Sequence, residues 1–265
     1  MEIIDTHTHI GQFGQWNCSC ETLMTCMRKF GVSQGIVSTI NGNEYDYELN
    51  LVNSDKGQIR INHDMLQEIK KYKGRLKALF WIRPHSEVAD RQLENYLEVN
   101  REWFVGLKAH PRCSNLKFSL ENYHTYLELC KKLALPFCIH TQNDGFSNIE
   151  YVYNVAKQYS DINFIAIHME MGTNHQCAMQ YIKECSNLYG DTTMVKIDDV
   201  IKAIRCCGSK KILFGSDAVV FGEDSYRRYD DFEEKLINTF SGTEIKDLFY
   251  NNAKRIFKYI GGSYE

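Results

Sequence analysis

Short strand-like runs alternate with amphipathic segments along the whole chain, and this repeat constrains the fold more than any other feature. A run of β-branched or apolar residues occurs eight times, and a segment with helical spacing follows each run. The runs are Glu2–His9, Gly35–Ile40, Arg75–Ile82, Trp103–His110, Pro136–Thr141, Ile162–His168, Thr192–Ile197 and Lys211–Ser216. Such a βα repeat is typical of a parallel sheet covered by helices.

Helix start signals lie between the runs. Ser147-Asn148-Ile149-Glu150 and Ser241-Gly242-Thr243-Glu244 both have the spacing of a capping box, in which the Ser and Glu side chains satisfy free backbone donors. Eight βα units in 265 residues favour a closed (β/α)8 TIM barrel, an α/β fold forming one domain over residues 1–265. An open doubly wound sheet is the alternative, but no GxGxxG or GxxxxGK[ST] phosphate loop supports it.

The composition excludes several classes of partner. With 31 Lys+Arg against 34 Asp+Glu, the chain carries a formal net charge of −3, whereas nucleic acids and anionic membranes select strongly basic surfaces. The longest apolar runs, such as Ala78–Ile82, are far too short to span a bilayer, and no signal peptide is visible at the N-terminus. We therefore expect a soluble, cytoplasmic protein that binds a small molecule; the sequence leaves a homodimer open.

The strongest local signal is the segment Asp5-Thr6-His7-Thr8-His9. Because successive side chains of a strand point to opposite faces, His7 and His9 point the same way, which in a barrel is inward at the C-terminal rim. Two imidazoles side by side at such a position are typical of a divalent metal site. The alternative for either residue is an ordinary hydrogen-bonded core histidine.

Other chemically active residues end the later strands. His140 ends the fifth run, His168 the sixth and Asp217 the eighth, while Lys108 and His110 end the fourth. Imidazole and carboxylate groups gathered at one rim predict a metal centre. A metal there would activate a water at neutral pH, Asp217 would take its proton, and the metal or His168 would polarise the substrate carbonyl. This chemistry predicts hydrolysis of an amide, ester or lactone. Two long polar stretches, residues 41–62 and 218–231, are expected to form walls of the site.

These residues resemble the metal pattern of the amidohydrolase superfamily, which has HxH on the first strand, His on the fifth and sixth, and Asp on the eighth. The phrases DTHTHIG, GLKAHP and FGSDA, with Asn252–Phe257 near the end, are most similar to its amidohydrolase-related branch. The resemblance implies a barrel with one or two divalent metals, most simply Zn²⁺. It implies that His7, His9, His140 and Asp217 are ligands, and that His168 binds a second metal or polarises the substrate.

The resemblance leaves two reactions open. Members of the same branch use this machinery for hydrolysis and for decarboxylation of aromatic or dienyl acids, and the ligand set does not separate the two. We expect a hydrolase first and a decarboxylase as the alternative. A non-catalytic metal-binding barrel is a third option, but it predicts the loss of a catalytic group, and none is lost here.

Basic residues cluster near the expected metal. In dihydroorotases, a lysine in a local sequence similar to Gly106–Pro111 is carbamylated and bridges two metals; we expect Lys108 to remain a plain cation instead, because the rest of the sequence matches the other branch. Arg83, Lys108, His110 and Arg112 follow neighbouring strands, which predicts a substrate with a carboxylate or comparable anion. The alternative is that Arg83 and Arg112 pair with acidic residues of the polar loops, such as Glu44, Asp46 or Glu223.

Overall fold

The computed structural model describes residues 1–52, 55–258 and 260. Its strands are β1 (Ile4–Phe13), β2 (Trp16–Cys18), β3 (Gln34–Thr39), β4 (Leu76–Trp81), β5 (Phe104–Ala109), β6 (Phe137–Gln142), β7 (Phe164–Met171), β8 (Leu188–Asp191) and β9 (Ile212–Leu213). Its α-helices are α1 (Cys20–Lys29), α2 (Gln58–Ile69), α3 (Arg91–Val99), α4 (Leu120–Leu133), α5 (Ile149–Ala156), α6 (Gln176–Glu184), α7 (Ile197–Cys207), α8 (Phe232–Ile237), α9 (Gly242–Lys246) and α10 (Asn252–Ile256).

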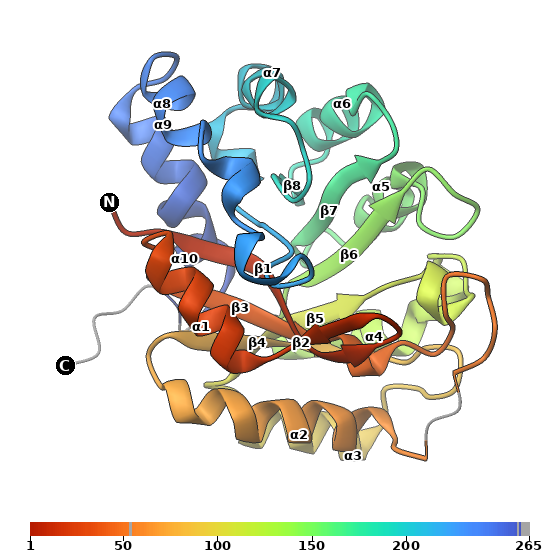
Figure 1. The fold of residues 1–265 in the computed structure, drawn as a ribbon. Coiled ribbons are helices and arrows are strands. Elements are labelled where there is room, and N and C mark those ends of the chain that lie inside the picture. The colour runs from red at the N-terminus through yellow and green to blue at the C-terminus, as the bar shows by residue number, and fades with distance from the viewer. Residues whose placement is uncertain (53–54, 259, 261–265) are drawn as a thin grey trace.

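The strands form one curled sheet in the order β2-β1-β3-β4-β5-β6-β7-β8-β9, with the helices packed around its outside (Figure 1). All pairs from β1 through β3 to β9 are parallel, and β2 folds back antiparallel on the end of β1, with Phe13 opposite Trp16. The βα order thus places the C-terminal ends of eight parallel strands at one rim. None of the helices in the described parts of the chain is both long and apolar enough to cross a membrane.

The two ends of the curled sheet approach each other without a regular ladder. The backbone N–H of Thr6 donates to the carbonyl of Phe214 at 2.9 Å, and Thr8 forms an isolated parallel bridge with Ala218. The predicted α/β class and parallel sheet are therefore confirmed. The complete (β/α)8 barrel is confirmed only as far as a curled sheet. Among the described residues β9 ends at Leu213, and the sheet closes through individual bonds between residues 6–9 and 214–218 instead of a ladder of two paired strands.

The sequence prediction is wrong at the seventh strand. The strand is β8, Leu188–Asp191, whereas the predicted run Thr192–Ile197 is the loop that leads into α7. Gly190 and Asp191 have low strand propensity, which hid the real strand. Thr192 has high strand propensity, but here its hydroxyl donates to the carbonyl of Gly215 at 3.0 Å and fixes the loop against β9.

Helix caps follow the sequence in one case and differ in the other. The capping box at Ser241 and Glu244 is present at the start of α9. The one predicted at Ser147 is wrong, because Asn148 caps α5 instead. The Ser147 hydroxyl donates to Asp144 Oδ1 at 3.0 Å, so it does not accept from the helix.

Inside the sheet, a layer of apolar side chains separates the two ends of the strands. Seven strands contribute buried residues to this layer, and β7 contributes both Ile165 and Ile167. We take one residue from each strand and call these seven the apolar floor: Ile4, Ile36, Leu79, Val105, Cys138, Ile165 and Leu213. From α10 and the residues after it, Ala253, Ile256 and Phe257 pack on the same cluster. Burial of a side chain of this size contributes about 1.5–3 kcal/mol to stability. Side chains further along the same strands therefore point into the space above the floor.

Candidate metal centre and active site

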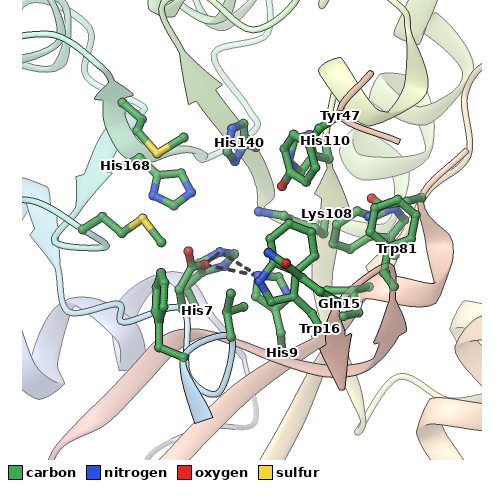
Figure 2. A pocket seen from close by; sticks show the side chains of 18 residues that line it. His7, His9, Gln15, Trp16, Tyr47, Trp81, Lys108, His110, His140 and His168 are labelled. Atoms are coloured by element: carbon green, nitrogen blue, oxygen red, sulfur yellow. Dashed lines mark hydrogen bonds and ion pairs between the residues drawn. The ribbon is translucent and has the colours of Figure 1, made fainter. Parts of the chain in front are cut away.

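A cavity of about 210 Å³ opens at the C-terminal ends of the strands, above the apolar floor (Figure 2). Its polar lining comes mostly from the predicted site residues: His7, His9, Lys108, His110, His140, His168 and Asp217. The rest of its wall is largely aromatic and includes Phe13, Trp16, Tyr47, Trp81 and Phe221. Tyr47 and Phe221 come from the two long polar stretches, as expected from the sequence.

Three donor atoms converge at one point of this cavity. Asp217 Oδ1 lies 2.8 Å from His7 Nε2 and 3.3 Å from His9 Nε2, and the two imidazole nitrogens are 3.1 Å apart. Metal–ligand bonds of about 2.0–2.2 Å separate neighbouring ligand atoms by about 2.9 Å in an octahedron and about 3.3 Å in a tetrahedron. The three observed separations span this range, and two nitrogens with one carboxylate oxygen suit Zn²⁺ and similar cations. The donor set therefore fits a divalent metal.

The surroundings of His9 fix it in the form that binds metals. His9 Nδ1 lies 3.3 Å from the carbonyl oxygen of Ser38, which only accepts hydrogen bonds, and 3.1 Å from the Ser38 hydroxyl. Nδ1 therefore carries the proton, which leaves a lone pair on Nε2 toward His7 and Asp217. His7 Nδ1, by contrast, is buried without a hydrogen-bond partner in the described residues.

His140 and His168 line the same cavity but lie outside the group of three converging donors. Their ring centroids are 4.6 Å apart, and the His168 ring lies 5.8 Å from that of His7. His168 Nδ1 is 3.3 Å from the carbonyl oxygen of Thr193, so Nδ1 carries the proton and Nε2 has a free lone pair. This tautomer suits a ligand or proton acceptor better than a hydrogen-bond donor to a substrate carbonyl.

Burial keeps most of these imidazoles neutral at pH 7. It is the largest cause that lowers the pKa of His7, His110 and His140 well below the usual value, and repulsion from nearby cationic groups adds to it. Burial likewise lowers the pKa of His168 to about 4, with opposition from the Asp217 charge. Because a metal binds neutral imidazole, the site is ready for ligation at neutral pH.

Asp217 is ionised although it is buried. Burial alone raises the pKa of its carboxyl, but the neighbouring imidazoles of His168, His7 and His9 favour the ionised form and hold that pKa well below the usual range. Its backbone has φ of +65°, a strained conformation for a residue other than glycine, and its N–H donates to the carbonyl of His7 at 2.9 Å. The end of the eighth parallel strand is thus tied to the first.

Lys108 points into the cavity, where it is 1% exposed (Figure 2). Burial lowers the pKa of its amine to about 8, against the favourable charge of Asp217. Its Nζ lies 5.8 Å from the centre of the Trp81 ring. Next to it, His110 stacks on His140 at 3.8 Å between ring centroids, and its Nδ1 accepts the N–H of Cys113 at 3.3 Å. His110 Nε2 therefore carries its proton and is the donor nitrogen.

The two predicted arginines are not brought to the cavity. Arg83 donates from Nη1 to the carbonyl of Lys56 at 2.6 Å and pairs with Glu87 at 3.6 Å. Arg112 donates to the carbonyl of Tyr47 at 2.9 Å and lies 4.0 Å from Asp144. Both engage the polar loops, although with partners other than the acidic residues expected. Of the predicted basic cluster, only Lys108 and His110 line the cavity.

Sequence reasoning missed Asp191, the residue that ends β8. Its buried carboxylate accepts the N–H of His168 at 2.8 Å, and the hydroxyl of Thr193 donates to it at 2.6 Å. His168, Met169 and Glu170 all have positive φ, so this bond holds a strained segment in place. An acidic residue at the end of a strand could have indicated this role. The predicted strand began at Thr192, however, and so placed Asp191 in the loop before the strand.

Solved structures that are similar to this chain share its fold at low identity. An uncharacterised TIM-barrel protein from Bordetella bronchiseptica aligns with a TM-score of 0.71 and 14% identity, over 97% of this chain and 98% of that one. The 5-carboxyvanillate decarboxylase of Sphingomonas paucimobilis gives 0.68 and 14%, over 97% and 99%. A putative 2-pyrone-4,6-dicarboxylic acid hydrolase from Pseudomonas putida gives 0.67 and 13%, over 97% and 98%.

Comparison with curated proteins found no match. Comparison with protein-family models, by contrast, assigns the chain to a family. The model described as amidohydrolase matches residues 34–259, which leaves the His7–His9 strand before the matched part and includes His140, His168 and Asp217 within it. Since this match covers most of the sequence, the chain belongs to the amidohydrolase family.

Proposed function

We propose that this protein is a metal-dependent hydrolase that cleaves an amide, ester or lactone of a small, anionic substrate. The observation that carries the proposal is the convergence of His7, His9 and Asp217 within a cavity that has room for a substrate. In the proposal these three residues bind the metal, Zn²⁺, and His140 and His168 complete its ligands or bind a second ion. When bound, the cation supplies the Lewis acidity that lowers the pKa of a water toward about 7.

Asp217 moves the proton in the proposed reaction. Its Oδ1 faces the two imidazoles, and its Oδ2 has no hydrogen bond within the described residues. Because the carboxylate is ionised at neutral pH, Oδ2 accepts the proton of the attacking water and then delivers it to the leaving group. Lys108, as a plain cation, binds the negative charge of the substrate, and His110 Nε2 donates a hydrogen bond.

Decarboxylation of an aromatic or dienyl acid is the second candidate, and the aromatic wall of the cavity favours it. Trp16 lies 5.4 Å from Tyr47 between ring centroids, and Trp81 lies 6.0 Å from His110 in a stacked arrangement. Such a wall suits a planar unsaturated acid, with Lys108 near its carboxylate. Two solved structures with this fold carry the name of a decarboxylase, which also supports this candidate.

Product analysis separates the two reactions. The metal-loaded protein would be incubated with matched amides, esters and lactones and with aromatic and dienyl acids, while released carbon dioxide and new carboxylate are both measured. Hydrolysis predicts a carboxylic acid and an amine or alcohol, without carbon dioxide. Carbon dioxide from the acids, with no cleavage of any carbonyl derivative, would refute the hydrolase proposal. The Asp217→Asn protein is the control for contaminating activity.

A further inference from the structure

A second cavity of about 210 Å³ adjoins the first and belongs to none of the roles described so far. It lies between the segment after β7 and the segment after β8. We call it the polar annex, lined by His168, Thr173, His175, Thr193 and Lys196 together with Met171, Gly172, Met194 and Asp199. His168, Met171 and Met194 line both cavities, so a molecule lying past His168 would have one part in each.

The uncharged polar groups of the annex are already oriented. The Thr173 hydroxyl donates to the carbonyl of Glu170 at 2.8 Å, and the Thr193 hydroxyl donates to Asp191. His175 Nδ1 lies 2.7 Å from the carbonyl oxygen of Met169, so Nδ1 carries the proton and Nε2 is an acceptor. These groups therefore offer oxygen and nitrogen acceptors to a ligand that carries N–H or O–H donors, such as an amine or alcohol.

The charges of the annex favour a ligand that carries an anionic group in addition to its N–H or O–H donors. Lys196 is exposed, and within the described residues its ammonium has no ion pair or hydrogen bond. Asp199 is the acidic residue of the lining, but its carboxylate is paired with Lys202 at 2.8 Å. A positive charge at Lys196 is thus left to bind a ligand.

We propose that the polar annex binds the leaving group of the substrate, and that this leaving group is an amino acid or hydroxy acid with a free carboxylate. The inference rests on the hydrolytic function proposed above. Hydrolysis releases two organic products on either side of the cleaved bond, whereas decarboxylation releases carbon dioxide and needs no second polar chamber. The substrate is then an acylated amino acid or hydroxy acid. Its acyl half lies in the aromatic cavity, where Lys108 binds any negative charge of that half, and the carboxylate of its leaving group lies at Lys196.

The proposed reaction balances with water as the second reactant. Water adds its oxygen to the carbonyl carbon, and Asp217 takes the proton. The bond from that carbon to nitrogen or oxygen then breaks, and the leaving amine or alcohol receives the proton in the annex. The products are a carboxylic acid in the aromatic cavity and a free amino acid or hydroxy acid in the annex.

Matched substrates test the role of Lys196. A panel of aromatic acyl groups would be joined to glycine and, separately, to glycinamide, which differ only in the terminal charge. We expect wild-type kcat/KM to favour the glycine derivative, and Lys196→Gln to reduce that preference about three- to tenfold, mainly through KM, with a larger loss in Lys196→Glu. Lys183→Gln, an exposed lysine in the last turn of α6, should leave the preference unchanged.

A binding measurement separates failure of the annex from failure of the proposed function. Calorimetric titration of the metal-free protein with N-benzoylglycine and N-benzoylglycinamide should show a preference for the former that Lys196→Gln removes. If amides are cleaved but Lys196→Gln changes neither preference, the annex proposal is overturned and the hydrolase proposal stands. If no amide is cleaved but the Lys196-dependent preference in binding persists, the hydrolase proposal fails and the anion site in the annex stands.

Discussion

At the scale of single residues, the carboxylate of Asp217 determines how the site is built. It is the one acidic group among the three converging donors, and its ionised form balances the positive charges of a bound metal and of Lys108. Its Oδ1 is shared by His7 and His9, while its Oδ2 remains available for proton transfer. In the proposed reaction one residue thus combines a structural and a catalytic task, and substitution should separate them.

Asp217→Asn should keep the fold and lose most turnover. The amide has the shape of the carboxylate but cannot take a proton from water, so we expect kcat to fall by about 10²-fold or more with little change in the thermal midpoint. Kinetics on any substrate from the panel above, combined with circular dichroism, would measure both effects. Activity within a few-fold of wild type would show that another group is the base.

The His7→Ala, His9→Ala double variant should lose bound metal. These residues supply two of the three converging donors, and the remaining ligands are too few for a stable tetrahedral site. Elemental analysis of protein purified without chelator would measure the metal per chain. His124→Ala, which removes an exposed histidine on α4, is the matched control and should keep the wild-type content. A wild-type content in the double variant would contradict the assignment of the site.

Asp191→Ala should destabilise the protein more than Asp191→Asn. Alanine leaves the N–H of His168 and the hydroxyl of Thr193 without their buried acceptor, whereas asparagine keeps one oxygen in place. We expect a loss of about 3 kcal/mol for alanine and about 1 kcal/mol for asparagine. Urea unfolding would measure both, with Asp198→Ala on the exposed side of α7 as the control. Equal, small effects would mean that Asp191 does not hold the His168 segment.

Some residues of the site were accessible to sequence reasoning and others were not. His7 and His9 are spaced two apart on a strand, so alternation alone assigns them to one face. The direction of a long arginine side chain does not follow from its place in the sequence. Arg83 and Arg112 donate to backbone carbonyls of the polar loops and do not reach the cavity. The protonated nitrogen of His168 was also beyond the sequence, because it depends on the carbonyl of Thr193.

At the scale of elements, the junction between β8 and β9 has very little free space. A Cβ added at Gly215 would lie 2.5 Å from Asp191 Oδ2, 2.6 Å from Thr193 Oγ1 and 3.1 Å from the Cβ of His7. Three strands of the sheet therefore meet around a glycine. The glycine is needed for close approach, and its position is coupled to both Asp191 and His7.

Gly215→Ala should lower stability and weaken metal binding together. The added methyl must displace Asp191 or His7, and overpacking of this kind costs about 1–3 kcal/mol. Gly242→Ala at the start of α9 meets no atom within 4 Å and should be nearly neutral. Urea unfolding and zinc titration of both variants would test this. Normal metal affinity in a destabilised Gly215→Ala protein would show that the strand junction is not coupled to the metal centre.

Elements with strong periodicity were predictable, and those with mixed composition were not. Six of the predicted runs overlap β1 and β3 to β7 because their β-branched and apolar residues are buried on both faces of the sheet. β8 was not predicted because its sequence is Leu-Tyr-Gly-Asp, in which Gly and Asp have low strand propensity. β9 is shorter than its run, since the chain leaves the ladder after Leu213 to form the Asp217 turn.

At the scale of the whole molecule, the change in folding stability at acid pH depends on buried titratable groups with opposite effects. Four histidines, His7, His110, His140 and His168, have pKa values lowered by burial, so between pH 6.5 and about 4 the unfolded chain binds protons that the folded chain does not. Burial raises the pKa of Asp5 to about 7 and that of Asp191 to about 6, which works in the opposite direction over the same window. Burial also raises the pKa of Glu87 and Glu170, which adds to this opposition at the acid end of the window; above that end the four histidines outnumber the two aspartates.

The metal-free protein should therefore lose stability as the pH falls. A net difference of up to two protons corresponds to a loss on the order of 2 kcal/mol per pH unit between pH 6.5 and 4.5. The midpoint of urea unfolding, measured at half-unit steps of pH, tests the sign and the size. Because a bound metal requires neutral imidazole, zinc should make the decline steeper. A midpoint that rises toward pH 4.5 would show that Asp5 and Asp191 dominate.

The apolar floor limits the side from which protons and solvent reach the cavity. Its seven strand residues are almost completely buried and form an apolar layer between the candidate metal centre and the N-terminal face of the sheet. Water, substrate and protons must then use the aromatic mouth and the annex. A substrate held in the mouth would shield the Asp217 proton from bulk solvent until that proton reaches the leaving group. Turnover and proton exchange with bulk solvent would thus use the same face of the sheet.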